Sequence, residues 1–119
     1  MNEECTVYKT MDIVSKKWSL VILLEIYKGN NGKKRFSEIK KSLQDITPKI
    51  LSIRLKDLEK QGLISKNIDS SQVPIKCEYK LTKSGIDFIN IIKNIKSWAL
   101  KWMDHRNLCE QLDCKECKL

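Results

Sequence analysis

DITPKILSIRLKDLEKQG, the stretch from residue 45 to residue 62, carries the start and stop signals of one helix. The hydroxyl of Thr47 can accept a hydrogen bond from a free backbone N–H at the helix start. Pro48 suits the first turn of a helix, where its missing N–H costs nothing. Gly62 directly follows Gln61 and is typical of a helix C-terminus. These signals predict a helix from Pro48 to Gln61.

The segments on both sides of this helix define the fold class. A helix that begins at Ser37 precedes it, across a connection from Ser42 to Thr47 that is as short as a helix-turn-helix requires. Two strands joined by a polar loop with a proline follow it, which indicates a hairpin. The pattern predicts an α+β winged helix-turn-helix with a long C-terminal helix. The other expected elements are helices over residues 6–14 and 17–27, a short strand over 33–35, hairpin strands over 63–68 and 76–81, and a final helix capped by Thr82.

The outward face of the helix at 48–61 is the candidate recognition surface. Leu51, Leu55 and Leu58 recur at helical spacing and are expected to face the core. The residues opposite these leucines then face solvent or a ligand. In a winged helix-turn-helix this second helix enters the major groove of DNA, and its N-terminal residues reach base edges. The residues expected to contact DNA are Thr47, Pro48, Lys49, Ser52, Ile53, Arg54 and Lys56 in the helix, and Ser71 and Gln72 at the hairpin tip.

Alternatives stay open for several of these residues. Arg54 lies to one side of the outward face, where it suits either a phosphate or an intramolecular carboxylate. Ser71 and Gln72 can contact a phosphate or the minor groove, or they can belong to a solvated loop. A single exposed lysine is usually an ordinary solvated residue, so the argument for DNA depends on the whole set.

The charge of the chain favours a polyanionic partner. Its 23 Lys and Arg against 15 Asp and Glu give a formal net charge of +8. Residues 28–60 hold ten Lys and Arg against four Asp and Glu, so three quarters of the net charge surrounds the proposed recognition helix. A basic surface of this kind binds double-stranded DNA or an anionic membrane. The capped helix and the hairpin that follows it favour DNA, and we expect no membrane contact.

The final helix predicts a homodimer because it carries two apolar faces. A domain this small covers only one of them. The second face is formed by Ile91, Ile95, Trp98 and Trp102. Such a surface needs a partner, and a second copy of the chain supplies one. The alternative is that the monomer covers both faces itself.

Short motifs at fixed spacings are spread along most of the chain. They are Cys5, Lys17-Trp18-Ser19 with Ile22-Leu23, Arg35-Phe36-Ser37-Glu38-Ile39, Ile46-Thr47-Pro48-Lys49, Leu51-Ser52-x-Arg54-Leu55-x-x-Leu58-Glu59, Gly62-Leu63-Ile64, Pro74, Glu78-Tyr79-x-Leu81-Thr82-x-x-Gly85 and Trp98. Together they resemble the HxlR family of winged-helix transcriptional regulators, which are relatives of the MarR type. The resemblance covers about residues 5 to 102.

The resemblance implies a homodimeric regulator that binds a palindromic operator through two recognition helices in successive major grooves. It implies that the first and last helices form most of the dimer interface. Val7 and Met11 of the first helix are therefore also expected to lie in this interface. It divides the chain into a winged helix-turn-helix domain at 5–102 and a cysteine-containing tail at 103–119. We expect no cofactor.

Cys5 is the candidate redox-sensing residue. The HxlR family commonly keeps a cysteine just before the first helix, and some members use it to sense oxidants or electrophiles. The positive end of a helix dipole favours a thiolate there, whereas Glu3 and Glu4 oppose it. Thr6 also replaces the proline often found after this cysteine in the family. In members that form a disulfide the partner can lie in the other subunit, for which this chain offers Cys109, Cys114 and Cys117.

The cysteines also allow two other interpretations. The tail holds His105, Cys109, Cys114 and Cys117, four soft ligands that could bind zinc or an iron–sulfur centre, and the last two have a common ligand spacing. The cysteines can also be inert thiols, and Cys77, in the second hairpin strand, is expected to be a small buried residue. No metal ligand is assigned.

The sequence predicts a cytoplasmic protein that is not an enzyme. His105 is the one histidine, the sequence has no Gly-rich phosphate loop, and the helix–wing core supplies no Ser/His/Asp set. The N-terminus lacks the basic start of a signal peptide. The longest apolar run, residues 20–24, is far shorter than the ~18 residues needed to cross a bilayer. The five cysteines are therefore expected to be reduced.

Overall fold

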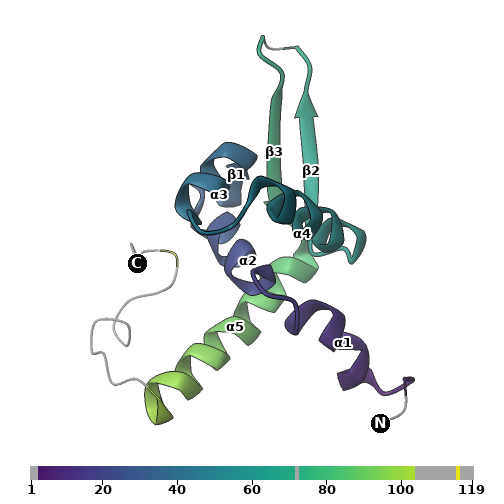
Figure 1. Cartoon of the computed structure of the whole chain (residues 1–119), viewed down its shortest axis with the longest axis vertical. Coiled ribbons are helices and arrows are strands. Elements are labelled where there is room, and N and C mark those ends of the chain that lie inside the picture. The colour runs from purple at the N-terminus through teal and green to yellow at the C-terminus, as the bar shows by residue number, and fades with distance from the viewer. Residues whose placement is uncertain (1–2, 72, 104–114, 116–119) are drawn as a thin grey trace.

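The computed structural model describes residues 3–71, 73–103 and 115 of the chain. A β hairpin projects from a body of short helices, and two further helices leave the body at the opposite end (Figure 1). In chain order the elements are α1 (Thr6–Val14), α2 (Ser19–Lys28), the 3₁₀ turn η1 (Asn30–Gly32), β1 (Lys33–Arg35), α3 (Phe36–Ser42), α4 (Pro48–Lys60), β2 (Ile64–Asp69), β3 (Lys76–Leu81) and α5 (Lys83–Trp102).

The element order confirms the predicted winged helix-turn-helix with a long C-terminal helix. α3 and α4 are the two helices of the motif, and β2 and β3 form the wing. The start of α2 differs from the prediction, which placed it at residue 17. Trp18 adopts the left-handed backbone conformation with φ of 82°, so the regular helix begins only at Ser19.

The three strands form one antiparallel sheet in the order β1-β3-β2. Ile64 pairs with Leu81 at the base of the hairpin, and Asp69 pairs with Lys76 near its tip. β1 is short and pairs with β3 only between Glu78 and Lys80. The outer part of the hairpin therefore extends beyond the sheet as a wing (Figure 1).

The core lies where α2 to α5 meet the base of the sheet. α2 contributes Ile22, Leu23 and Ile26, which are completely buried, and α4 contributes the three leucines that the sequence placed inward. Burial of this apolar surface holds the recognition helix against the sheet. The buried core residues are Ile22, Leu23, Ile26, Ile39, Ile46, Leu51, Leu55, Leu58, Leu63, Ile64, Tyr79, Leu81, Ile89 and Ile92.

The first turn of α5 packs closely against the base of the wing. Thr82 caps this helix as predicted, because its hydroxyl accepts a hydrogen bond from the Gly85 N–H at 3.1 Å. Gly85 itself packs so closely that a Cβ atom there would lie 2.1 Å from the carbonyl oxygen of Leu63. Only glycine permits this approach, which fixes the angle at which α5 leaves the body.

Among the described residues, no other element covers most of α1 or the second face of α5. The two helices diverge on the side of the body away from the wing (Figure 1). No residue of α1 is buried, and Val7 is 59% exposed. On α5, Trp98 is 58% and Trp102 66% exposed. These exposed fractions favour a partner for the second face of α5 over the alternative that the monomer covers both faces.

Candidate nucleic-acid interface

The first turn of α4 has the geometry that the sequence predicts. Thr47 has extended backbone dihedral angles, and its hydroxyl accepts a hydrogen bond from the Ile50 N–H at 3.2 Å. Pro48 occupies the first position of the helix. Thr47 thus satisfies the Ile50 N–H, and Pro48 has no N–H that needs a partner. No other element is needed to cap α4, so its N-terminus stays open to a ligand.

Among the residues expected to contact DNA, those opposite the buried leucines of α4 are Lys49, Ser52, Ile53 and Lys56. The leucines of the opposite face are buried, so the helix can rotate little about its axis. Lys60 continues the same outward face by one further turn. Ser52 is half-buried, and the exposed members of the set are Thr47, Pro48, Lys49, Ile53 and Lys56.

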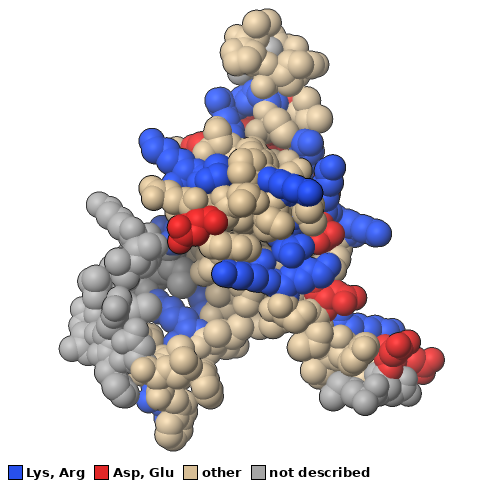
Figure 2. Space-filling view, in the orientation of Figure 1, with Lys and Arg blue, Asp and Glu red and all other residues tan. Residues whose placement is uncertain are grey.

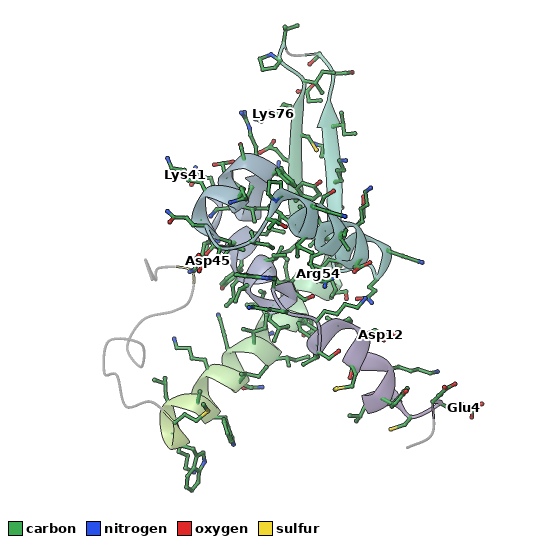
Figure 3. All side chains as sticks on the ribbon, in the orientation of Figure 1. Glu4, Asp12, Lys41, Asp45, Arg54 and Lys76 are labelled. Carbon is green, nitrogen blue, oxygen red and sulfur yellow. The ribbon has the colours of Figure 1, made fainter. Side chains whose placement is uncertain are left out.

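Arg54 makes intramolecular contacts. Its guanidinium donates to the carboxylate of Asp57 at 3.3 Å and to the backbone carbonyl of Lys17 at 3.2 Å. Lys16 also reaches the Asp57 carboxylate, at 3.4 Å. Figure 3 places Arg54 beside the segment that joins α1 to α2. Of the two roles that the sequence left open for Arg54, the structure places the residue in the intramolecular one, where it ties α4 to this segment.

The wing presents a carboxylate that the sequence analysis did not consider. The Asp69 side chain accepts hydrogen bonds from both the backbone N–H and the hydroxyl of Ser71. These hydrogen bonds lower the pKa of Asp69 below its ordinary value, so the wing keeps a negative charge close to its tip. Ser71 is exposed as expected, although its hydroxyl is engaged, and Gln72 lies outside the described residues.

Basic side chains gather over the body of the molecule. Figure 2 shows Lys and Arg side chains around α3, α4 and the strands, with fewer Asp and Glu among them. Three of the ten basic residues counted between 28 and 60 nevertheless form ion pairs inside the fold, namely Lys28, Lys34 and Arg54. Lys49, Lys56 and Lys60 have no ion pair among the described residues. The charge available to a ligand is therefore smaller than the sequence count, and it is shared between α4 and the segment formed by β1 and α3.

The carboxylate that neutralises two of these lysines is buried beneath the helix-turn-helix. Glu25 of α2 lies 2.8 Å from the ammonium group of Lys34 and 3.6 Å from that of Lys28. Burial raises the pKa of Glu25, but the hydrogen bond and charge of Lys34 and the charge of Lys28 outweigh it and leave the pKa below 4.5. Lys34 also contacts the hydroxyl of Ser42, so this network links α2, β1 and the end of α3.

We expect Glu25→Gln to lower the free energy of unfolding by about 1–3 kcal/mol at neutral pH, because it leaves the two lysines without their carboxylate. A lowered folded-state pKa gives stability that is present above the unfolded-state pKa and is lost as the pH falls through the folded-state pKa. Urea unfolding at neutral and acid pH should therefore show wild type losing more stability than Glu25→Gln. Glu59→Gln, the same change at an exposed position of α4, is the control. Parallel pH profiles for wild type and Glu25→Gln would contradict this account.

Cys5 lies at the N-terminus of α1. It is half-buried and has an extended backbone, and its backbone carbonyl accepts a hydrogen bond from the Lys9 N–H at 3.0 Å. Cys77 of β3 is half-buried against the core, rather than fully buried as predicted. Among the described residues no group of His, Cys, Asp and Glu is placed to hold a metal ion. The tail residues considered as ligands, His105, Cys109, Cys114 and Cys117, lie outside the described part of the chain.

Comparison with known proteins agrees with this architecture. The model of the HxlR-like helix-turn-helix family matches residues 13–107. The uncharacterized HTH-type transcriptional regulator YvaP of Bacillus subtilis is 36% identical over 96 residues, which are 81% of this chain and 85% of YvaP.

Several solved structures share the fold. A protein described as a MarR-family regulator from Porphyromonas gingivalis has a TM-score of 0.76 at 35% identity and covers 87% of this chain and 97% of its own. The reduced form of the transcriptional regulator YodB from B. subtilis has a TM-score of 0.73 at 25% identity, covering 87% and 98%. The redox regulator HypR in its oxidized form has a TM-score of 0.69 at 33% identity, covering 82% and 96%.

A capped and exposed second helix, a β wing beside it and a basic surface around both define a winged helix-turn-helix regulator of transcription, which binds DNA. The chain belongs to the HxlR family of such regulators and is structurally similar to MarR-type proteins. This is a family of regulators and not of enzymes, as the sequence predicted. Within the part of the chain that the structure describes, no helix has the length and apolar character to cross a membrane.

Proposed function

We propose that the protein acts as a homodimer on a palindromic operator, with the two α4 helices in successive major grooves. The observation that carries the dimer is the uncovered apolar surface of α1 and α5. Val7 and Met11 on α1 are exposed, as are Ile91 and Ile95 on α5, and the two tryptophans extend the surface. A twofold axis through these helices buries both surfaces at once. A regulator of this kind works in the cytoplasm, beside the chromosome.

The proposed DNA contacts follow from the exposure and charge of α4 and the wing. The first turns of α4, from Thr47 to Ile53, reach base edges, and Lys49 and Lys56 meet phosphates. The wing approaches the sugar–phosphate backbone through Ser71, and Gln72 is proposed to contribute from the sequence alone. Arg54 acts indirectly, because its hydrogen bond to the Lys17 carbonyl holds α4 against the segment between α1 and α2.

Selection of bound sequences from a random DNA pool tests this proposal. The expected result is an enriched inverted repeat whose half-sites lie about one helical turn apart, because two symmetric helices read them. Sedimentation of the protein alone should give a dimer. Anionic vesicles are the matched competitor, since a basic surface also binds them. Binding to vesicles without preference among DNA duplexes would overturn the proposal.

A thiol-dependent response of this regulator is a second proposal, and the position of Cys5 favours it. Cys5 immediately precedes α1, a helix that has no fully buried residue and that we assign to the dimer interface. HypR, which is similar to this chain, is a redox regulator by name, and YodB has reduced and diamide-treated structures. The proposed step joins the sulfurs of Cys5 and of a tail cysteine in the other subunit. The two thiols lose two protons and two electrons, which the azo bond of diamide accepts.

Cys5→Ser should abolish a diamide-induced dimer band on non-reducing gels and the accompanying change in operator affinity. Cys77→Ser, which changes a cysteine held in the wing, should behave like wild type and serves as the control. Mobility-shift assays with and without diamide measure the affinity change. Equal responses of wild type and Cys5→Ser would show that Cys5 is not the sensor. Stoichiometric metal that is lost on mutation of Cys114 would instead favour a metal site in the tail.

A further inference from the structure

α4 places one aliphatic side chain in the middle of its otherwise polar outer face. Ile53 is 39% exposed, whereas the leucines of α4 are buried and Ile50 is half-buried against the core. Lys49 lies one turn before Ile53 and Lys56 lies one turn after it. Neighbours at this spacing have Cβ atoms about 5–6 Å apart, so Ile53 is an apolar spot flanked by two ammonium groups.

Neither the core nor the proposed dimer interface uses this side chain. Ile53 points away from the buried leucines, and the uncovered apolar residues assigned to dimerisation belong to α1 and α5. A ligand that suits it must offer a small apolar group close to negative charges on either side. The major groove of DNA offers this combination, because the C5-methyl group of thymine is its apolar group and lies between two rows of phosphates.

We propose that Ile53 determines part of the sequence specificity by packing on a thymine methyl group in each half-site. The proposal rests on the operator binding proposed above and deepens it. Ile53 lies about 7.5 Å along the helix axis from Pro48, so it belongs to the first two turns, which enter the groove. Lys49 and Lys56 hold the flanking phosphates and bring the side chain onto the base. An aliphatic group cannot form hydrogen bonds, so this contact depends on the methyl group alone.

Replacement of thymine by deoxyuridine tests the contact, because it removes the methyl group and leaves base pairing intact. The operator is first obtained by selection with the wild-type dimer, and symmetry-related thymines are then replaced one pair at a time. For one symmetry-related pair of thymines, the replacement should lower the affinity of wild type about fourfold for each half-site, or roughly 15-fold in total. Ile53→Ala should bind the thymine and uracil operators equally, whereas Ile53→Leu should keep most of the discrimination.

Thr47→Ser is the matched control, because the methyl group of the capping threonine is the other group that could contact a thymine methyl group. It removes that methyl group, keeps the capping hydroxyl and should retain full thymine discrimination. Three results would each overturn the assignment of Ile53. Wild type could bind every uracil operator as well as the thymine operator, the selected operator could contain no thymine, or the discrimination could survive in Ile53→Ala. Failure to select any operator would instead overturn the proposed function itself. The two failures are therefore distinct.

Discussion

Replacing Trp98 with alanine should raise the dissociation constant of the dimer by at least about two orders of magnitude. Trp98 is 58% exposed in the single chain, on a face of α5 that no other described element covers. If a second copy buries this side chain, its truncation costs about 3–5 kcal/mol of association free energy. A twofold interface contains the residue twice, so the effect of one substitution is felt at two places.

Sedimentation equilibrium over a range of concentrations measures this effect. The fold of the variant should persist, because the side chain contributes little to the core of its own subunit. Far-UV circular dichroism checks that point. Ile68→Ala is the control, since Ile68 is equally exposed but lies on wing strand β2, away from α1 and α5. A wild-type chain that stays monomeric at high concentration, or a Trp98→Ala variant that associates like wild type, would show that these helices do not form a dimer interface.

The elements were predictable because their signals are local. Thr47 and Thr82 each cap a helix through a hydroxyl that accepts an N–H three residues later, and the sequence shows both residues directly. The leucines of α4 recur at helical spacing and are all buried. The start of α2 was missed because Trp18 takes a positive φ, and no neighbouring glycine or asparagine signals such a conformation.

The candidate site was predictable in its position but not in its charge. The exposed face of α4 follows from helix geometry once the inward leucines are known. The count of basic residues between 28 and 60 did not include Glu25, which precedes that segment and neutralises two of its lysines from below. The pairing of Arg54 with Asp57 was one of two open choices, and the link to the α1–α2 segment could only be seen in three dimensions.

Burial within the single chain is also the basis for the proposed interface with a second copy. An amphipathic helix normally buries one face, yet α1 buries none and α5 buries only the face that carries Ile89 and Ile92. Cys5 begins the helix that would move if the two subunits shifted. The segment after that helix contacts α4 twice, because Lys16 pairs with Asp57 and the Lys17 carbonyl accepts a hydrogen bond from Arg54. A change at the dimer interface therefore has a direct path of contacts to the recognition helix.

Combining Lys49→Ala with Lys56→Ala should reduce both the affinity for the operator and its dependence on salt. Each phosphate contact adds about 0.9 to the slope of log affinity against log salt concentration. Two lysines in each of two subunits make four proposed contacts, so the slope should fall by roughly 3.6. On raising the salt from about 50 to 200 mM, wild type should then lose roughly 100-fold more affinity than the double variant.

Fluorescence anisotropy with the selected operator measures both slopes. The fold should survive, because both side chains are exposed and have no ion pair among the described residues. Lys9→Ala with Lys101→Ala is the matched control, since it removes the same charge from α1 and the end of α5, which point away from α4 (Figure 1). The control should keep the wild-type slope when assayed well above the dissociation constant of the dimer. An unchanged slope in Lys49→Ala with Lys56→Ala would remove these lysines from the DNA interface, whereas an equal loss in the control would mean that net charge, and not the α4 face, governs binding.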